Sequence, residues 1–271
     1  MTSFEVAYSS VKGNLHHIRK LPNQDAIDVK TLGDILLVSI ADGHGSRTCF
    51  RSDTGSKMAV EVANVLVADK LLNSNHDLEA LEKQSKMLCK EICALWSKTV
   101  LRHLGKNAFL DDEVECLNES KRRDLGKNAL LAYGTTLMTL ILSKNKIIVI
   151  NIGDGELLVK FKDKEDVKVL NQSKRIGNET ESLALPYAHR YYTVNTYDSS
   201  DVIAILAATD GYPNSFKQEK GYMKVIDDLL QIKKSHGIKA IQDNLGTWLE
   251  DTSKNGSGDD ITACFVTNIA Q

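Results

Sequence analysis

Two apolar runs separated by a very short connection constrain the fold of this chain more than any other feature. The runs Leu137–Leu142 and Lys146–Ile152 are rich in Ile, Leu and Val, and only Ser143, Lys144 and Asn145 lie between them. Such a short connection permits an antiparallel hairpin, whereas a parallel crossover needs a dozen residues or more. The sequence therefore predicts a sheet that is at least partly antiparallel.

Further β-rich runs and helical patterns lie along the rest of the chain. The other predicted strands are Glu5–Ser9, Ile35–Ala41, Val202–Thr209 and Ile261–Val266. The predicted helices are Ser56–Leu72, Leu78–Leu104, Tyr222–Ile232 and Ile238–Leu249, with Gly237 separating the last two. Consecutive helices before the hairpin favour an α+β fold over regular alternation of strands and helices. No linker or repeat divides the sequence, so we expect a single domain over residues 1–271.

Charge balance and apolar patterning exclude several classes of protein. The 271 residues include 34 Lys and Arg against 36 Asp and Glu, and the net charge of −2 argues against a nucleic-acid binder with a large basic field. No apolar run approaches the roughly 18 residues that span a bilayer, and the first residues lack a signal-peptide pattern. Five cysteines, an odd and low count, indicate reduced thiols. We expect a cytoplasmic monomer with neither nucleic acid nor membrane as partner.

Aspartates recur beside the predicted strands. They occur in the pairs Asp42-Gly43, Asp154-Gly155, Asp210-Gly211 and Asp259-Asp260, and at Asp25. A single Asp-Gly pair is ordinary turn chemistry, because Asp bonds its own backbone and Gly accepts a positive φ. Several carboxylates at adjacent strand ends would instead repel one another unless a cation neutralises them. Oxygen ligands without His or Cys suit Mg²⁺ or Mn²⁺ rather than Zn²⁺, and two such ions are a common device for hydrolysing phosphate esters.

These acids stand within a longer ordered set of motifs. The set consists of Asn23-Gln24-Asp25, Asp42-Gly43-His44-Gly45, Gly134-Thr135-Thr136, Ile152-Gly153-Asp154, Thr209-Asp210-Gly211 and Gly258-Asp259-Asp260-Ile261-Thr262. It resembles the metal-dependent serine/threonine protein phosphatases of the 2C type, from about residue 13 onward. The resemblance implies an α+β fold, a β-sandwich of two antiparallel sheets flanked by helices on both sides. It also implies hydrolysis of phosphoserine and phosphothreonine in proteins by a metal-activated water.

The resemblance further implies which residues hold the metal ions. Asp42 would bridge two Mn²⁺ or Mg²⁺ ions, and the Gly43 carbonyl and Asp25 would complete the protein ligands of one of them. Asp210 and Asp259 would hold the other ion.

A weak third ion is left open by the sequence. Asp154 matches a position that binds this ion in some relatives. Asn214 stands where relatives often have a further Asp, and Gly155 stands where they commonly have Ser.

The phosphate-binding position departs from the usual family pattern. Many members carry Arg five residues before the first metal-binding Asp, where this chain has Lys20, and Gln24 replaces a usual Glu. A bacterial branch instead shows Gly-x-x-His followed later by Gln-Asp, as in Gly13 to His16 and Gln24-Asp25. We therefore expect His16 to face the substrate phosphate, with Lys20 as the alternative, and an exposed surface histidine as the competing interpretation.

The remaining site expectations concern a proton donor and two surface segments. His44, next to Asp42, is the candidate acid for the leaving alkoxide, and a structural hydrogen bond to an aspartate is its alternative role. Residues 171–190 are expected to form a flap over the site. The polar segment 105–128 is expected to be a solvated loop or short helix.

Three functions compete at this point. The first is a standalone bacterial phosphatase acting on a phosphorylated protein and opposing a Ser/Thr kinase. The second is a catalytically weak phosphatase-like domain that binds phosphoproteins or regulates a partner, and the complete set of acids argues against it. The third is a haloacid-dehalogenase-type phosphohydrolase, which needs an Asp-x-Asp motif and a parallel sheet. Asp42-Gly43-His44 does not supply that motif.

Overall fold

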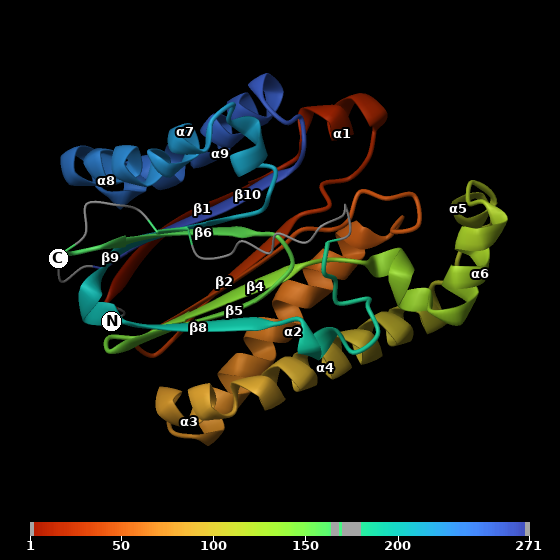
Figure 1. Ribbon diagram of the computed structural model, residues 1–271, viewed down its shortest axis with the longest axis horizontal. Coiled ribbons are helices and arrows are strands. Elements are labelled where there is room, and N and C mark those ends of the chain that lie inside the picture. Colours follow the sequence, from red (N-terminus) through yellow and green to blue (C-terminus); the bar gives the residue numbers. More distant parts are fainter. Residues whose placement is uncertain (1–2, 164–167, 170–179, 269–271) are drawn as a thin grey trace.

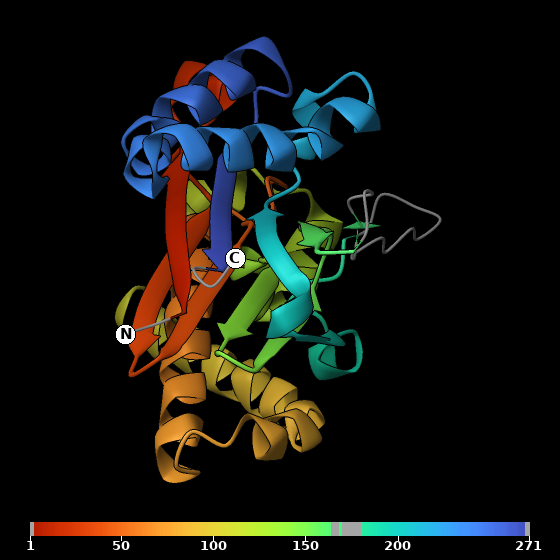
Figure 2. The same cartoon turned by 90° about the vertical axis from the view of Figure 1, so that its left-hand side faces the viewer.

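Two antiparallel sheets stack face to face in the computed structural model, which describes residues 3–163, 168–169 and 180–268 (Figures 1 and 2). The first sheet has the strand order β1 (Phe4–Val11), β10 (Ile261–Asn268), β9 (Val202–Ala208), β6 (Glu156–Phe161) and β7 (Lys168–Val169). The second has the order β2 (Ala26–Leu32), β3 (Ile35–Ala41), β4 (Leu137–Leu142), β5 (Lys146–Ile152) and β8 (Thr193–Asp198).

Helices cover the outer face of each sheet, which confirms the predicted α+β sandwich (Figures 1 and 2). Above the first sheet in Figure 1 lie α1 (Asn14–Arg19), α7 (Glu219–Met223), α8 (Val225–His236) and α9 (Ile238–Asn255). Below the second sheet lie α2 (Ser52–Asn73), α3 (Leu78–Lys83) and α4 (Ser85–Lys106), with α5 (Asp111–Glu115) and α6 (Glu119–Lys127) beyond them. Short 3₁₀ turns occupy Ala129–Tyr133, Ala188–Arg190, Ser199–Asp201 and Pro213–Ser215.

The hairpin predicted from its short connection is confirmed. β4 and β5 pair antiparallel with Leu137 opposite Ile152. Strands in the middle of each sheet are buried on both faces. In β3, for example, Val38 packs between the sheets while Leu37 packs toward α2 and α4. Burial on both faces explains why these strands read as continuous apolar runs.

Several elements differ from the sequence prediction. β2, β6, β7 and β8 were not predicted, and β2 and β8 are the edge strands of their sheet, where polar side chains replace the apolar run. The helix predicted over Leu78–Leu104 is divided at Gln84 into α3 and α4. The break predicted at Gly237 is confirmed by its position between α8 and α9 with φ 80°.

The segment 105–128 forms short helices and is attached to the rest of the molecule by Arg51 and by the buried side chains of Leu117 and Leu125. Arg51 donates from Nε and Nη2 to the two carboxylate oxygens of Glu113 at 2.8 and 2.7 Å. Its Nη1 also donates to the Tyr133 hydroxyl at 2.9 Å. A bidentate arginine–carboxylate pair fixes orientation as well as distance. The segment is therefore held against the start of α2.

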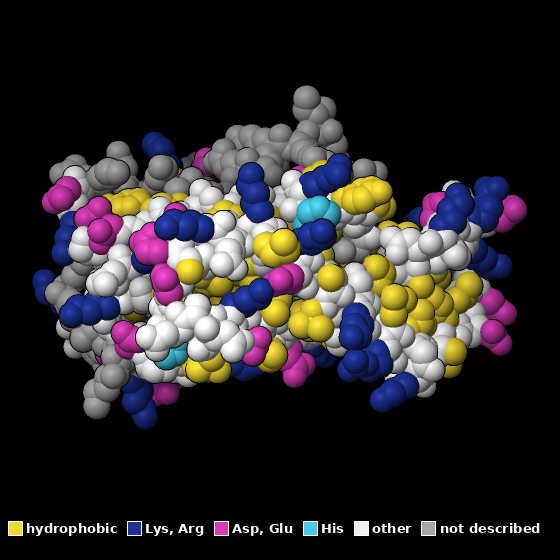
Figure 3. Space-filling model, turned by 90° about the horizontal axis from the view of Figure 1, so that it is seen from below, with side chains coloured by type: hydrophobic (Ala, Val, Ile, Leu, Met, Phe, Trp, Pro, Cys, Tyr) yellow, Lys and Arg dark blue, Asp and Glu magenta, His cyan; other side chains and the backbone are white. Residues whose placement is uncertain are grey.

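The outer helical layer has a mixed surface. Seen from below, Lys and Arg side chains are interspersed with hydrophobic ones (Figure 3). The exposed hydrophobic residues of α2 and α4 are Val65, Leu72, Met87 and Leu101. Among the described residues, no helix has the length and apolar character needed to cross a membrane.

Candidate active site

Five aspartates from distant parts of the sequence lie at one end of both sheets, which we call the acid edge. Asp25 directly precedes β2, Asp42 directly follows β3, and Asp154 lies between β5 and β6. Asp210 follows β9, and Asp259 precedes β10. Antiparallel pairing brings these positions together, because one strand begins where its neighbour ends. Ala26 is opposite Ala41, for instance, so Asp25 and Asp42 adjoin the same end of a strand pair.

Burial and mutual repulsion dominate the electrostatics of this edge. Burial raises the pKa of Asp42 well above its usual range, and the neighbouring charges of Asp25, Asp210 and Asp259 raise it further. Burial is also the largest cause of the raised pKa of Asp25 and of Asp210. Asp154 is the next cause for Asp210. Carboxylates held together in this way favour a bound cation, and oxygen-only ligands suit a hard divalent ion.

Hydroxyl and amide groups hold two of these carboxylates in place. The Thr209 hydroxyl donates to Asp25 Oδ2 at 2.7 Å, and the backbone N–H of Thr262 donates to the same hydroxyl at 2.9 Å. Asn214 Nδ2 donates to Asp210 Oδ2 at 3.1 Å. These contacts leave other carboxylate oxygens for a metal ion. The donor set at the acid edge therefore fits Mn²⁺ or Mg²⁺.

The loop after β3 is fixed by the Gly134-Thr135-Thr136 motif. The backbone N–H of Asp42 donates to the Thr136 hydroxyl at 2.9 Å, and the N–H of Thr136 donates to the Asp42 carbonyl at 2.8 Å. Gly43 donates to the Gln24 carbonyl at 3.1 Å. A Cβ on Gly43 would lie 2.6 Å from that carbonyl oxygen and 2.8 Å from the Ser52 oxygen. Only glycine allows this approach, which sets the position of the Asp42 side chain.

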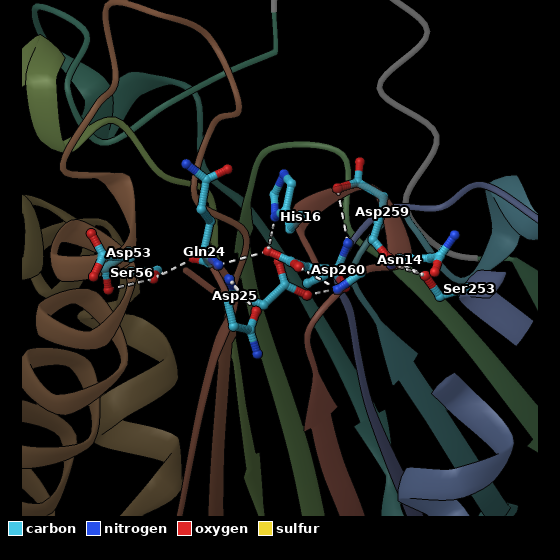
Figure 4. A network of polar contacts seen from close by, with 12 residues as sticks. Asn14, His16, Gln24, Asp25, Asp53, Ser56, Ser253, Asp259 and Asp260 are labelled. Atoms are coloured by element: carbon cyan, nitrogen blue, oxygen red, sulfur yellow. Dashed lines mark hydrogen bonds and ion pairs between the residues drawn. The ribbon is translucent and has the colours of Figure 1, made fainter. Parts of the chain in front are cut away.

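Asp260 organises the acid edge, and the sequence analysis gave it no role. Its side chain is 3% exposed. Figure 4 shows it between His16 and the backbone of Gln24, and it accepts from His16 Nδ1 at 2.8 Å and from Gln24 N–H at 2.6 Å. It also accepts from Gly13 N–H at 2.6 Å. Gly13 lies so close that a Cβ would meet the Asp259 carbonyl carbon at 2.3 Å. The signal available in the sequence was the second acid of the pair, directly before a buried strand.

His16 is buried at the acid edge rather than exposed on the surface, with 7% of the residue accessible. The hydrogen bond from Nδ1 to Asp260 is the main reason that its pKa is raised, and it leaves Nε2 for any further contact. His16, Asp259 and Asp260 also offer possible ligand atoms within 4.8 Å of one another. Lys20 is exposed and ends α1 in the left-handed conformation, with φ 58°.

His44 and Asp154 lie near each other at the acid edge. Burial lowers the pKa of His44, which favours a neutral imidazole, and the nearby Asp154 charge opposes this effect. Asp154 Oδ2 accepts from the Thr180 hydroxyl at 2.8 Å. Part of the flap expected over residues 171–190 falls outside the described residues, which resume at Thr180.

Comparison with known proteins identifies the family. Residues 12–250 match the family model described as Protein phosphatase 2C. The chain belongs to this family. A search of curated proteins returned no match.

Solved structures share the fold at low sequence identity. A bacterial serine phosphatase matches with a TM-score of 0.62 and 14% identity, covering 98% of each chain. The catalytic domain of the serine/threonine phosphatase PstP, solved with two manganese ions, matches with a TM-score of 0.57 and 17% identity over 97% of each chain. PppA from Pseudomonas aeruginosa, a regulatory component of a type VI secretion system, gives 0.58 and 15% over 97% of each chain. By its family, this chain is a metal-dependent protein serine/threonine phosphatase that acts on phosphorylated protein.

Proposed function

We propose that this phosphatase hydrolyses phosphoserine and phosphothreonine at a pair of Mn²⁺ or Mg²⁺ ions held by Asp25, Asp42, the Gly43 carbonyl, Asp210 and Asp259. The observation that carries the proposal is the gathering of these groups at one end of both sheets, where burial and then the charges of Asp25, Asp210 and Asp259 raise the pKa of Asp42. When bound, such ions activate water and neutralise phosphate oxygens. Asp42 is the central ligand in this proposal, because the largest charge effects on it come from the other three aspartates.

We propose separate roles for the two histidines. Asp260 accepts from His16 Nδ1, which orients the ring and favours its protonated form, so that Nε2 can donate to a phosphate oxygen. Lys20 is exposed and provides a weaker, more mobile positive charge. His44 is the candidate donor to the leaving alkoxide, and proximity to Asp154 supports that role against the lowering effect of burial.

A third ion at Asp154 is the weakest element of the proposed site. One oxygen of Asp154 already accepts from Thr180, and Asn214 supplies an amide rather than a carboxylate beside Asp210. We therefore propose two ions as the working set. We further propose that residues 1–271 act as one cytoplasmic, monomeric domain on proteins phosphorylated by a Ser/Thr kinase.

The test is phosphate release from a phosphoserine peptide and from p-nitrophenyl phosphate. After treatment with EDTA and desalting, activity is expected to be lost, and added Mn²⁺ is expected to restore it. Full activity after thorough chelation would refute the metal site. A domain that only binds phosphoproteins would bind the peptide in the presence of Mn²⁺ and release no phosphate.

A further inference from the structure

A pocket adjoins the acid edge, and His44 is the one lining residue with a role in the chemistry proposed above. Its volume is about 280 Å³, and its hydrophobic wall is formed by Leu131, Ala184 and Leu185. Cys49 also lines it, and burial raises the pKa of this thiol, so that it behaves as a small apolar group. The rest of the lining is polar and includes His44, Glu181 and the hydroxyl groups of Ser46, Thr180 and Ser182.

The pocket opens directly beside the aspartates. His44 lines the pocket and directly follows Asp42 and Gly43 in the loop after β3. Thr180, another lining residue, donates to Asp154 Oδ2 at 2.8 Å. A substrate whose phosphate lies at the acid edge would therefore place neighbouring groups at the mouth of this pocket.

Both walls of the pocket are attached to one short piece of chain. His44 N–H donates to the Gly134 carbonyl at 3.0 Å, which fixes the wall that comes from the loop after β3. Leu183 N–H donates to the Thr135 carbonyl at 2.9 Å, which fixes the hydrophobic wall. The N–H of Ala184 is held by the Ser182 hydroxyl at 3.2 Å. The pocket is thus already formed and has a fixed position relative to Asp42.

Gly134, which lines the pocket, leaves space between His44 and Cys49. A Cβ on Gly134 would lie 3.0 Å from His44 Cδ2 and 3.1 Å from Cys49 Sγ. These distances are tighter than ordinary carbon contacts, so a side chain at this position would crowd the space between the two walls.

We propose that the pocket binds one apolar side chain of the substrate, from a residue within two positions of the phosphorylated Ser or Thr. This inference rests on the proposed phosphatase function and adds a sequence preference to it. The volume lies just below the range of pockets for whole small ligands, which begins at about 300 Å³, and is suited to a single Leu- or Phe-sized group. Successive residues of an extended peptide lie about 3.3 Å apart, so a neighbouring residue reaches the pocket while the phosphate stays at the acid edge.

The experiment compares phosphoserine peptides as substrates of the Mn²⁺-loaded protein of residues 1–271. The baseline peptide has Ala at the two positions on each side of phosphoserine, and each position is then changed singly to Leu or to Asp. At one of them, Leu is expected to raise kcat/KM about tenfold over Ala, in keeping with discrimination by hydrophobic pockets, and Asp is expected to lower it.

Variants of the pocket wall separate this site from other surfaces. Leu185→Ser removes apolar surface and Leu185→Phe fills the space, so both are expected to abolish the preference for Leu and leave turnover of the Ala peptide unchanged. Leu72→Ser, at an exposed position of α2, is the matched control and is expected to retain the preference. Melting temperatures of all variants verify that they are folded.

The outcomes distinguish this inference from the function on which it rests. Equal kcat/KM for Leu and Ala at every position, with Mn²⁺-dependent turnover intact, would overturn the pocket and leave the phosphatase standing. A preference that survives both Leu185 variants would also overturn it, because the preference would then come from another surface. No turnover of any peptide would overturn the proposed function and this inference with it.

Discussion

The two ends of the second sheet both gather carboxylates, and they neutralise them in different ways. At the acid edge, burial and then the charges of Asp25, Asp210 and Asp259 raise the pKa of Asp42. At the opposite end, Glu79 and Glu82 from α3 meet Lys146 at the start of β5, and Glu82 Oε2 lies 2.5 Å from Lys146 Nζ. The hydrogen bond from Lys146 lowers the pKa of Glu82.

This difference concerns the source of the positive charge that neutralises the carboxylates at each end. Lys146 brings the positive charge for its end of the sheet within the chain itself. At the acid edge, the groups with the largest effects on Asp25, Asp42 and Asp210 are carboxylates, hydroxyls and an amide. A dissolved cation can complete that end, whereas Lys146 already satisfies the other.

The largest expected effect is on kcat/KM, when one acid is replaced at each end of the second sheet. Asp42→Asn and Asp210→Asn are each expected to lower kcat/KM by at least about a hundredfold at saturating Mn²⁺, since even partners outside the metal shell cost 10–100-fold. Glu79→Gln at the opposite end is expected to leave kcat/KM unchanged. The measurement is hydrolysis of p-nitrophenyl phosphate over a Mn²⁺ titration.

Stability in EDTA completes this test. Both Asp→Asn variants are expected to melt at least as high as the wild type, because each removes one member of a repelling cluster. Near-normal turnover by either variant would contradict the assignment of metal ligands. A melting temperature far below that of the wild type would show that the carboxylate serves the fold instead.

Metal binding should stabilise the protein through the acid edge and not through the opposite end of the sheet. At a Mn²⁺ concentration a hundred times the Kd, the free energy of unfolding is expected to rise by about 2.7 kcal/mol for each ion bound. For a chain of this length that corresponds to a rise in Tm of roughly 5–10 °C. Glu79→Gln should show the full rise and Asp42→Asn little of it, in differential scanning fluorimetry. An equal rise in both variants would mean that Mn²⁺ binds elsewhere.

In the second sheet, the sequence predicted the central strands better than the edge strands. β3, β4 and β5 match the predicted runs because both faces are buried and the run is wholly apolar. β2 was missed because Asp28 and Lys30 interrupt it, as is usual for an edge strand. Pairing across the sheet supplies the strand character that its own residues do not.

The same limit applies to the candidate site. Acids followed by Gly can be found by inspection, so Asp42 and Asp210 were evident as candidates. Asp260 was not, since its importance depends on Gly13 and Gln24, more than 200 residues away in sequence. Contacts of that separation are made by the completed sandwich and leave no local pattern.

Phosphate binding by His16 is expected to give a smaller effect than loss of a metal ligand. His16→Ala should raise KM about tenfold and change kcat less, because a charge-assisted hydrogen bond of roughly 1.5–3 kcal/mol is partly shared by bound substrate and transition state. Lys20→Ala should have a weaker effect, since Lys20 is exposed. Steady-state kinetics with a phosphoserine peptide measure both.

A matched variant separates the two nitrogens of His16. His16→Asn keeps a donor near the position of Nδ1, where it can still bond Asp260, and loses Nε2. It should therefore raise KM as His16→Ala does while retaining more of the wild-type Tm. A larger rise in KM for Lys20→Ala than for His16→Ala would assign phosphate binding to Lys20.

The smallest effect is expected at the end of the second sheet where Lys146 neutralises the glutamates of α3. Lys146→Met removes the cation shared by Glu79 and Glu82, and Glu79 is 64% exposed, so solvent screens much of the interaction. The free energy of unfolding at pH 7 should fall by about 1 kcal/mol or less, with no change in kcat/KM.

The same pair predicts how this difference depends on pH. The folded-state pKa of Glu82 is lowered, so the stability that the ion pair gives the folded protein is present above the ordinary Glu pKa of about 4.3 and is lost as pH falls through the folded-state value. Urea denaturation of both proteins between pH 7 and pH 3 should therefore show the difference shrinking as the pH falls. A difference that persists at pH 3 would mean that Lys146 stabilises this end by packing of its aliphatic stem, and the contrast with the acid edge would no longer be one of charge.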